Sequence, residues 1–153
     1  MSPEATRIEH DLLGEKPVPA DAYYGIQTAR ALENFHLSGV ELQLYPNLIK
    51  ALAMVKLAAA RANVDCGQFG PEILYGIEGA CRELIAGGLH DQFRLDVLQG
   101  GAGTSTNMNA NEVIANRGLE LMGHAKGDYA RLSPHDHVNG SQSTNDAYPT
   151  ALH

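Results

Sequence analysis

The chain has 153 residues, enough for one compact domain that buries about two-thirds of the surface of its unfolded form. Hydrophobic residues make up 44% of it and charged residues 19%, which excludes a disordered chain and is typical of a globular protein. Eighteen acidic residues against eleven basic ones give a formal net charge of −7, which argues against nucleic acid or an anionic membrane as a partner.

Two features bear on the cellular compartment. No window of the sequence reaches the ~18 apolar residues of a membrane-spanning helix, and the charged start MSPEATRIEHDLLGEKP lacks the apolar core of a secretion signal. A cytoplasmic location is the resulting expectation. Cys66 and Cys81 have neither the spacing of a zinc site nor the number needed for a disulfide framework, so we expect both to be buried apolar thiols.

The first part of the chain is predicted to be an extended arm followed by a short helix. Residues 7–24 alternate weakly between polar and apolar types and contain Pro17 and Pro19, which favours a strand-like arm or a small hairpin. The segment GIQTARALENF then predicts a helix of about three turns that ends near His36.

Two longer helices follow, and each begins at a proline, which has no N–H group to leave unpaired in the first turn. The helix from Pro46 has apolar residues at the helical spacing of one buried stripe, namely Leu48, Leu52, Val55, Ala59 and Ala62. The helix from Pro71 ends at Gly87-Gly88 and has an apolar face made of Ile73, Leu74, Ile77, Cys81, Leu84 and Ile85. Together they predict a helical hairpin.

Two further helix starts lie in the second half of the chain. One helix is predicted from Thr104 to Gly123, with the hydroxyl groups of GTST as caps. The last one is predicted to be capped by Asp146, with Pro149 in its first turn. Because a helix of about seven residues is marginal by itself, we expect the chain to be a piece of a longer protein. We also expect the residues after Gly140 to be loosely ordered or held by neighbouring chains.

Both of these helix starts are rich in small neutral hydrogen-bonding groups. The first N–H groups of a helix lack internal partners, and with the positive end of the helix dipole they favour an anion. Hydroxyl and amide groups add donors at both starts, namely Thr104, Ser105 and Thr106 at the first and Ser141, Ser143, Thr144 and Asn145 at the second. Two such sites would suit a small dicarboxylate. The alternative is that these side chains only cap their helices.

Three segments carry a resemblance to a known family. They are DLLGEKPVPADAYYGIQTARALENF at 11–35, DVLQGGAGTSTNMNANEVIANRGLELMG at 96–123 and HVNGSQSTNDAYPT at 137–150. Through them the chain resembles the aspartase/fumarase superfamily, and within it the aspartate ammonia-lyases, over nearly its whole length. Family members run to several hundred residues, so this chain would be about their first third.

The resemblance implies a mainly α-helical fold with an extended arm or small hairpin. Residues 1–140 would form the N-terminal domain of the family, and residues 141–153 the first part of its central helical-bundle domain, with the boundary loop at 133–139. In the family, each active site is assembled from three subunits of a homotetramer. The full-length parent is therefore expected to be a homotetramer, while the oligomer formed by this chain alone is left open.

The reaction that the resemblance implies is the reversible anti elimination of ammonia from L-aspartate to give fumarate, through an aci-carboxylate intermediate. Carried over by residue, the substrate-binding groups are Thr104, Ser143, Thr144, Asn145 and Arg30. The family's catalytic base lies on a serine-rich loop without a counterpart in this sequence. No catalytic residue is therefore expected here, and the chain alone should be inactive. No organic cofactor is implied, and a divalent cation activator is left open.

Two alternatives to an ammonia-lyase stay open. A class II fumarase would have the same fold and release water, but the segments ADAYYG, QGGAGTS and QSTND are closer to the ammonia-lyases. A non-catalytic helical module would use the same hydroxyl groups only as caps. The asparagines of NMNAN, Asn107, Asn109 and Asn111, are interpreted mainly as scaffold that holds the helix start at Thr104 in shape. The His-Asp-His triplet at 135–137 gives weak geometry for a metal, and it departs at Ser133 and His135 from the family's accessory anion site.

Overall fold

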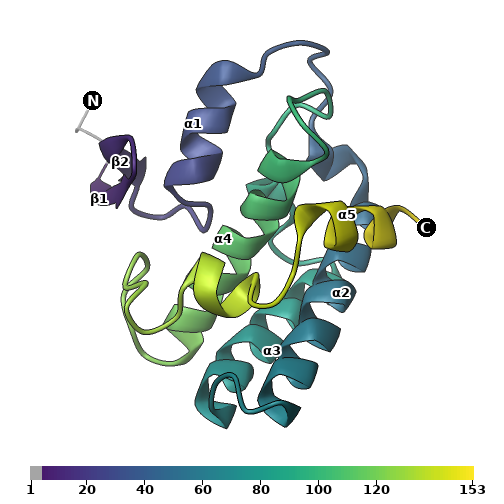
Figure 1. Cartoon of the computed structure of the whole chain (residues 1–153). Coiled ribbons are helices and arrows are strands. Elements are labelled where there is room, and N and C mark those ends of the chain that lie inside the picture. Colours follow the sequence, from purple (N-terminus) through teal and green to yellow (C-terminus); the bar gives the residue numbers. More distant parts are fainter. Residues whose placement is uncertain (1–4) are drawn as a thin grey trace.

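The computed structural model describes residues 5–153, so residues 1–4, which the predicted N-terminal domain includes, lie outside the described residues. The chain is mainly helical with one small hairpin (Figure 1), as expected. Strands β1 (Thr6–Asp11) and β2 (Gly14–Pro19) pair antiparallel, with Asp11 opposite Gly14 at the turn. The prediction of a hairpin in the N-terminal arm is confirmed.

The helices are α1 (Ile26–Asn34), α2 (Pro46–Asp65), α3 (Pro71–Ala86), α4 (Thr104–Leu121) and α5 (Thr144–Leu152). Short 3-10 turns cover Leu42–Leu44 and His90–Gln92, and a π-helical turn covers Pro134–Val138. The predicted short helix and the three longer ones are confirmed. No helix within residues 5–153 is long and apolar enough to cross a membrane.

The core lies where α2, α3 and α4 pack together. The first two form the expected helical hairpin, and α4 runs against α3 (Figure 1). Helices α3 and α4 approach each other closely at Gly118, where a Cβ atom would lie 2.9 Å from Leu132 Cδ1 and 3.0 Å from the backbone of Gly76. Two facing glycines thus permit the crossing. The fully buried side chains of the core include Ile77, Leu84, Phe93, Leu95, Val113, Ile114 and Leu119.

The buried face of α2 differs from the predicted apolar stripe. The buried residues of this helix are Ile49, Leu52, Ala53, Lys56, Leu57, Ala60 and Asn63. Only Leu52 belongs to the predicted set; Leu48, Val55 and Ala59 are half-buried and Ala62 is exposed. The predicted stripe is wrong because a purely apolar pattern leaves out Lys56 and Asn63. Both are buried, since they donate hydrogen bonds to the turn before α5.

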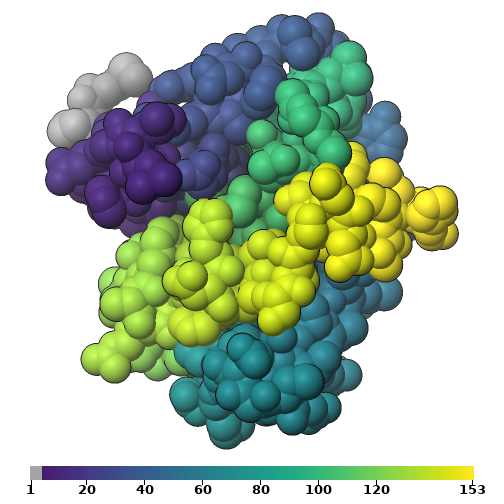
Figure 2. Space-filling view, in the orientation of Figure 1, coloured from purple at the N-terminus to yellow at the C-terminus, as the bar shows by residue number. Residues whose placement is uncertain are grey.

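Three local predictions are wrong. Cys81 is buried as expected, but Cys66 is exposed because it follows the last residue of α2, beyond the packed face of that helix. Helix α5 is capped by Ser143, not by Asp146, so Pro149 falls in the second turn. The residues after Gly140 are not loosely ordered, because α5 packs on α2 and α4 and buries Ala147 and Ala151. Figure 2 shows the C-terminal segment in yellow lying against these helices.

Candidate functional site

The first candidate site is the start of α4. Gly103 precedes the helix with a left-handed φ of 82° and, within residues 5–153, no hydroxyl group caps this end. The N–H group of Thr106 instead donates to Gln99 Oε1 at 2.7 Å, so the predicted capping by GTST is wrong. Thr104 is exposed, and its hydroxyl group forms no hydrogen bond in the described part of the chain. The Thr104 hydroxyl group can therefore donate or accept a hydrogen bond at this helix start.

A buried aspartate fixes the loop that leads into this start. Asp96 accepts hydrogen bonds from the N–H groups of Leu37, Ser38, Gly39 and Leu98 at 2.7 to 3.0 Å and from the Ser38 hydroxyl at 2.6 Å. These bonds, that of the Ser38 hydroxyl foremost, hold the pKa of Asp96 well below its usual range. The carboxylate therefore ties the loop after α1 to the loop before α4.

The second candidate site is the start of α5. Ser143 Oγ caps the helix by accepting from the N–H group of Asn145 at 3.2 Å. Thr144 Oγ1 accepts from Asn107 Nδ2 of α4 at 3.2 Å, which leaves the hydroxyl hydrogen of Thr144 to be donated elsewhere. Ser143 and Asn145 are exposed. The start of α5 therefore presents hydroxyl, amide and N–H donors.

The fold brings these two helix starts together. Besides the bond from Asn107 to Thr144, the ring of Tyr148 packs on Gly103, where a Cβ atom would lie only 2.4 Å from Tyr148 Cδ1. Any other residue at 103 would hold α5 away from α4. Figure 1 shows α5 beside the first turns of α4. Thr104, Ser143, Thr144 and Asn145 thus lie on neighbouring helix ends, far apart in sequence but adjacent in the fold.

Arg30 has a different set of neighbours. Its guanidinium group donates from Nε and Nη2 to the two oxygens of Asp11 at 2.9 Å, and from Nη2 to the Gly14 carbonyl at 3.0 Å. These bonds lower the pKa of Asp11 and join α1 to the hairpin. Nη1 forms no hydrogen bond within residues 5–153. The structure therefore places Arg30 on α1 with its guanidinium group bound to the hairpin, and within residues 5–153 none of its hydrogen bonds reaches the two helix starts.

A buried polar cluster lies beneath the second start, and sequence reasoning missed it. Asn139 Oδ1 accepts hydrogen bonds from Lys56, Asn107 and Asn111 at 3.0 to 3.1 Å. The asparagines of α4 act as scaffold, but not at the expected place: Asn107 and Asn111 hold Asn139 beneath the second start, and Asn109 donates to the carbonyl of Gln92. Lys56 lies four residues after Leu52 and four before Ala60, a spacing that would have placed it on the buried face.

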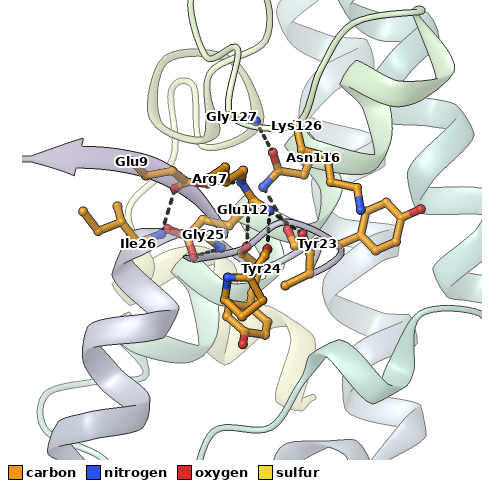
Figure 3. A network of polar contacts seen from close by, with 12 residues as sticks. Arg7, Glu9, Tyr23, Tyr24, Gly25, Ile26, Glu112, Asn116, Lys126 and Gly127 are labelled. Carbon is orange, nitrogen blue, oxygen red and sulfur yellow. Dashed lines mark hydrogen bonds and ion pairs between the residues drawn. The ribbon is translucent and has the colours of Figure 1, made fainter. Parts of the chain in front are cut away.

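The start of α1 is a third anion-binding helix end, already filled by the protein itself (Figure 3). Glu112 of α4 accepts from the N–H groups of Gly25, Gln27 and Thr28 at 2.8 to 3.1 Å, and Glu9 accepts from Ile26 at 2.8 Å. Burial raises the pKa of Glu112 to about 7, against the effect of its hydrogen bonds. A cavity of about 650 Å³ beside Glu112 is lined mainly by the hairpin turn, α4 and the loop at 133–135.

The His-Asp-His triplet lies on the π-helical turn. His137 Nδ1 accepts from the N–H group of Ser133 at 2.9 Å, and its ring meets Phe69 edge-on with centroids 5.6 Å apart. Ser133 caps this turn, because its Oγ accepts from the N–H group of Asp136 at 3.0 Å. Within residues 5–153, no group of three or more His, Cys, Asp or Glu side chains is placed to hold a metal ion.

Comparisons with known proteins show which proteins this chain is similar to. The aspartate ammonia-lyase of Pseudomonas aeruginosa is 63% identical over an alignment 153 positions long, which covers 99% of this chain and 32% of that protein. A crystal structure of fumarate lyase:delta crystallin from Brucella melitensis, bound to cobalt, superposes with a TM-score of 0.95 at 58% identity over 97% of this chain and 32% of the other. A crystal structure of a class II fumarase from Schistosoma mansoni superposes with a TM-score of 0.86 at 40% identity, over 97% of this chain and 31% of the other.

The chain thus spans about a third of the length of the proteins that it matches. The match to a family model described as lyase extends over residues 14–153 and so includes β2, every helix and both candidate helix starts. This chain belongs to that lyase family.

Proposed function

We propose that this chain is the N-terminal part of an ammonia-lyase that catalyses the reversible anti elimination of ammonia from L-aspartate to give fumarate. The observation that carries the proposal is the packing of two donor-rich helix starts against each other, through Asn107 and Thr144 and through Gly103 and Tyr148. Such a pair fits the carboxylate groups of a small dicarboxylate. The relative named aspartate ammonia-lyase, at 63% identity, supports the choice of substrate.

The chemical difficulty of this reaction is the concentration of negative charge. Removal of the proton on the carbon next to one carboxylate turns that group into an aci-carboxylate dianion, and ammonia then leaves from the neighbouring carbon. Donors that are fixed in place before the reaction stabilise the dianion, and loss of one such donor costs about 3 to 4 kcal/mol. We assign this task to Ser143, Thr144 and Asn145 at the start of α5, where the helix dipole adds to it.

The remaining candidate residues would bind the other end of the substrate. The Thr104 hydroxyl and the side-chain oxygen of Asn145 can accept from the ammonium group, and Thr104 can also donate to a carboxylate. Arg30 would act through Nη1, because its other donors are engaged by Asp11 and Gly14. No residue of this chain is assigned as the general base.

The wider proposal concerns the full-length parent. The base and the long helices of the central domain would come from chain beyond residue 153, with residues 1–140 as the N-terminal domain and residues 141–153 opening the central one. The parent would be a cytoplasmic homotetramer without an organic cofactor, and this chain alone would be inactive.

The test is the absorbance of fumarate on mixing the full-length parent with L-aspartate, with L-malate and the 153-residue chain as parallel samples. Fumarate from aspartate alone, and none from the short chain, is the expected result. Fumarate from malate would make the parent a class II fumarase, as the 40% identity to that enzyme of Schistosoma mansoni allows. If neither substrate gives fumarate, the non-catalytic helical module is the alternative that remains.

A further inference from the structure

The side chain of Lys56 is the largest fully buried one in the described chain, with 0% of its surface exposed. Its ammonium group donates to two neutral amide oxygens, Asn139 Oδ1 at 3.0 Å and Gln142 Oε1 at 2.9 Å. No carboxylate within residues 5–153 forms an ion pair with it. A buried cation without an anionic partner costs free energy, so its presence requires a reason.

The turn that Lys56 holds is strained. Ser141 has a φ of 59°, in the left-handed region that residues other than glycine rarely adopt. Side-chain hydrogen bonds fix the turn around it. Asn63 Nδ2 donates to the Gly140 carbonyl, Gln142 Nε2 to the Val138 carbonyl and Asn139 Nδ2 to the Gln142 carbonyl, while Lys56 donates to both Asn139 and Gln142. Such strain persists only where surrounding contacts over-determine the backbone.

The turn leads directly into the start of α5. Asn139 Oδ1, which Lys56 binds, also accepts from Asn107 Nδ2, and the same Nδ2 donates to Thr144 Oγ1 at 3.2 Å. The ammonium group is thus connected to the candidate hydroxyl through one shared oxygen and one amide.

From this geometry we propose that Lys56 is a positioning residue for the carboxylate site at the start of α5. It holds residues 139–142 in the conformation that presents Ser143, Thr144 and Asn145, and its positive charge is balanced by the substrate carboxylate when the site fills. The inference rests on the proposed function, since it assumes that a carboxylate binds there.

The charges that face Lys56 allow a pH test. Burial lowers the pKa of Lys56 to about 8, although the carboxylate of Asp146 of α5 favours the charged form. Cys81 of α3 also faces Lys56, but its own burial raises its pKa to about 12 and keeps the thiol neutral in this range. Because the folded pKa is below the unfolded value of 10.5, the buried charge weakens the fold at low pH, and stability rises between about pH 8 and 10.5. Carboxylate binding should change in the opposite direction and weaken as pH rises through 8.

The experiment compares the full-length parent with its Lys56→Met and Lys50→Met variants, the second being a half-buried lysine of the same helix. We expect the KM for L-aspartate and the inhibition constant of succinate to rise on the order of tenfold in Lys56→Met, with a smaller change in kcat. The rise of the succinate constant above pH 8 should disappear in this variant, and Lys50→Met should behave as wild type. A folded Lys56→Met with unchanged constants would overturn the proposal.

A second variant covers the case in which Lys56→Met does not fold. Asn139→Asp keeps the lysine and places a carboxylate 3.0 Å from its nitrogen, so that the charge is neutralised inside the protein. Weaker succinate binding in this variant supports the inference, and unchanged binding refutes it. If wild type neither converts aspartate nor binds succinate, it is the proposed function that fails. If wild type does both and the variants match it, only the role of Lys56 fails.

Discussion

The hydroxyl groups at the two helix starts differ in what they bind. Ser143 caps α5 through the N–H group of Asn145, whereas Thr144 is oriented by Asn107 from another helix, and Thr104 caps nothing. Capping and ligand binding are therefore not exclusive alternatives in this chain. A capping role can be predicted from local sequence, but the orientation of Thr144 depends on a residue 37 positions away.

The hydroxyl group of Thr144 should matter for turnover. Thr144→Val keeps the shape but removes the donor, so we expect kcat/KM for L-aspartate in the full-length parent to fall about 10² to 10³-fold. Thr144→Ser retains the hydroxyl and should retain most of the activity. Thr150→Val, an exposed threonine of the same helix whose hydroxyl bonds the Asp146 carbonyl, is the control. A loss equal in both valine variants would mean that only helix stability had changed.

Asp96 should make the stability of the chain depend on pH. Its pKa is lowered in the folded state, so its contribution is present above the unfolded value of about 3.9 and is lost as pH falls toward the folded one. Asp96→Asn should therefore lower the urea midpoint at pH 7, and the difference from wild type should shrink below about pH 4. Asp91→Asn, at an exposed aspartate, should leave the midpoint unchanged. A difference that is constant with pH would contradict this account.

At the scale of elements, local sequence signals predicted where the helices begin and end, but not which of their residues are buried against other helices. Prolines at the first position of α2 and α3, and Gly87 with a φ of 100° after α3, are visible in the sequence and gave the right helix limits. The buried face of α2 was predicted at the wrong residues because Lys56 and Asn63 can be buried. Their polar groups form hydrogen bonds with Asn139 and Gly140, more than 70 residues away in the sequence. Polar residues in a core can be predicted only when their partners are known.

The docking of α5 on α4 should depend on Gly103. Gly103→Ala adds a methyl group against the Tyr148 ring and also strains a φ of 82°, so we expect a loss of unfolding free energy well above the ~1 kcal/mol of backbone strain alone. Gly123→Ala is the matched control, since its φ is 80° but nothing lies within 4 Å of its added Cβ. The free energy of unfolding in urea, measured for wild type and for each variant, gives both losses.

A double variant separates the two causes at Gly103. Tyr148→Ala removes the ring, so in its background Gly103→Ala should cost about as much as Gly123→Ala. If the cost of Gly103→Ala stays the same with and without the ring, then α5 does not depend on this contact, and the proximity of the two helix starts needs another explanation.

At the scale of the whole molecule, the mainly helical class, the hairpin and the family were predicted from the sequence, and the meeting of the two helix starts was not. The chain positions 104 and 144 come together because α4 packs on α3, α3 packs on α2, and α5 packs on both α2 and α4. Each of these packings depends on tertiary contacts such as the Gly76–Gly118 crossing. The residue types of the candidate site could be read locally, but their common location follows from the complete arrangement of helices.

The same arrangement predicts that this chain folds without the rest of its parent. Its accessible surface of 7837 Å² is close to the roughly 7,500 Å² of a compact monomer of this mass. The helical circular dichroism of the 153-residue chain should therefore be lost in a single cooperative urea transition, while the folded chain forms no fumarate from L-aspartate. A gradual, non-cooperative loss would mean that the helices need the missing part in order to pack. Turnover by the folded chain would mean that a base lies within these residues, contrary to the assignment of that role to chain beyond residue 153.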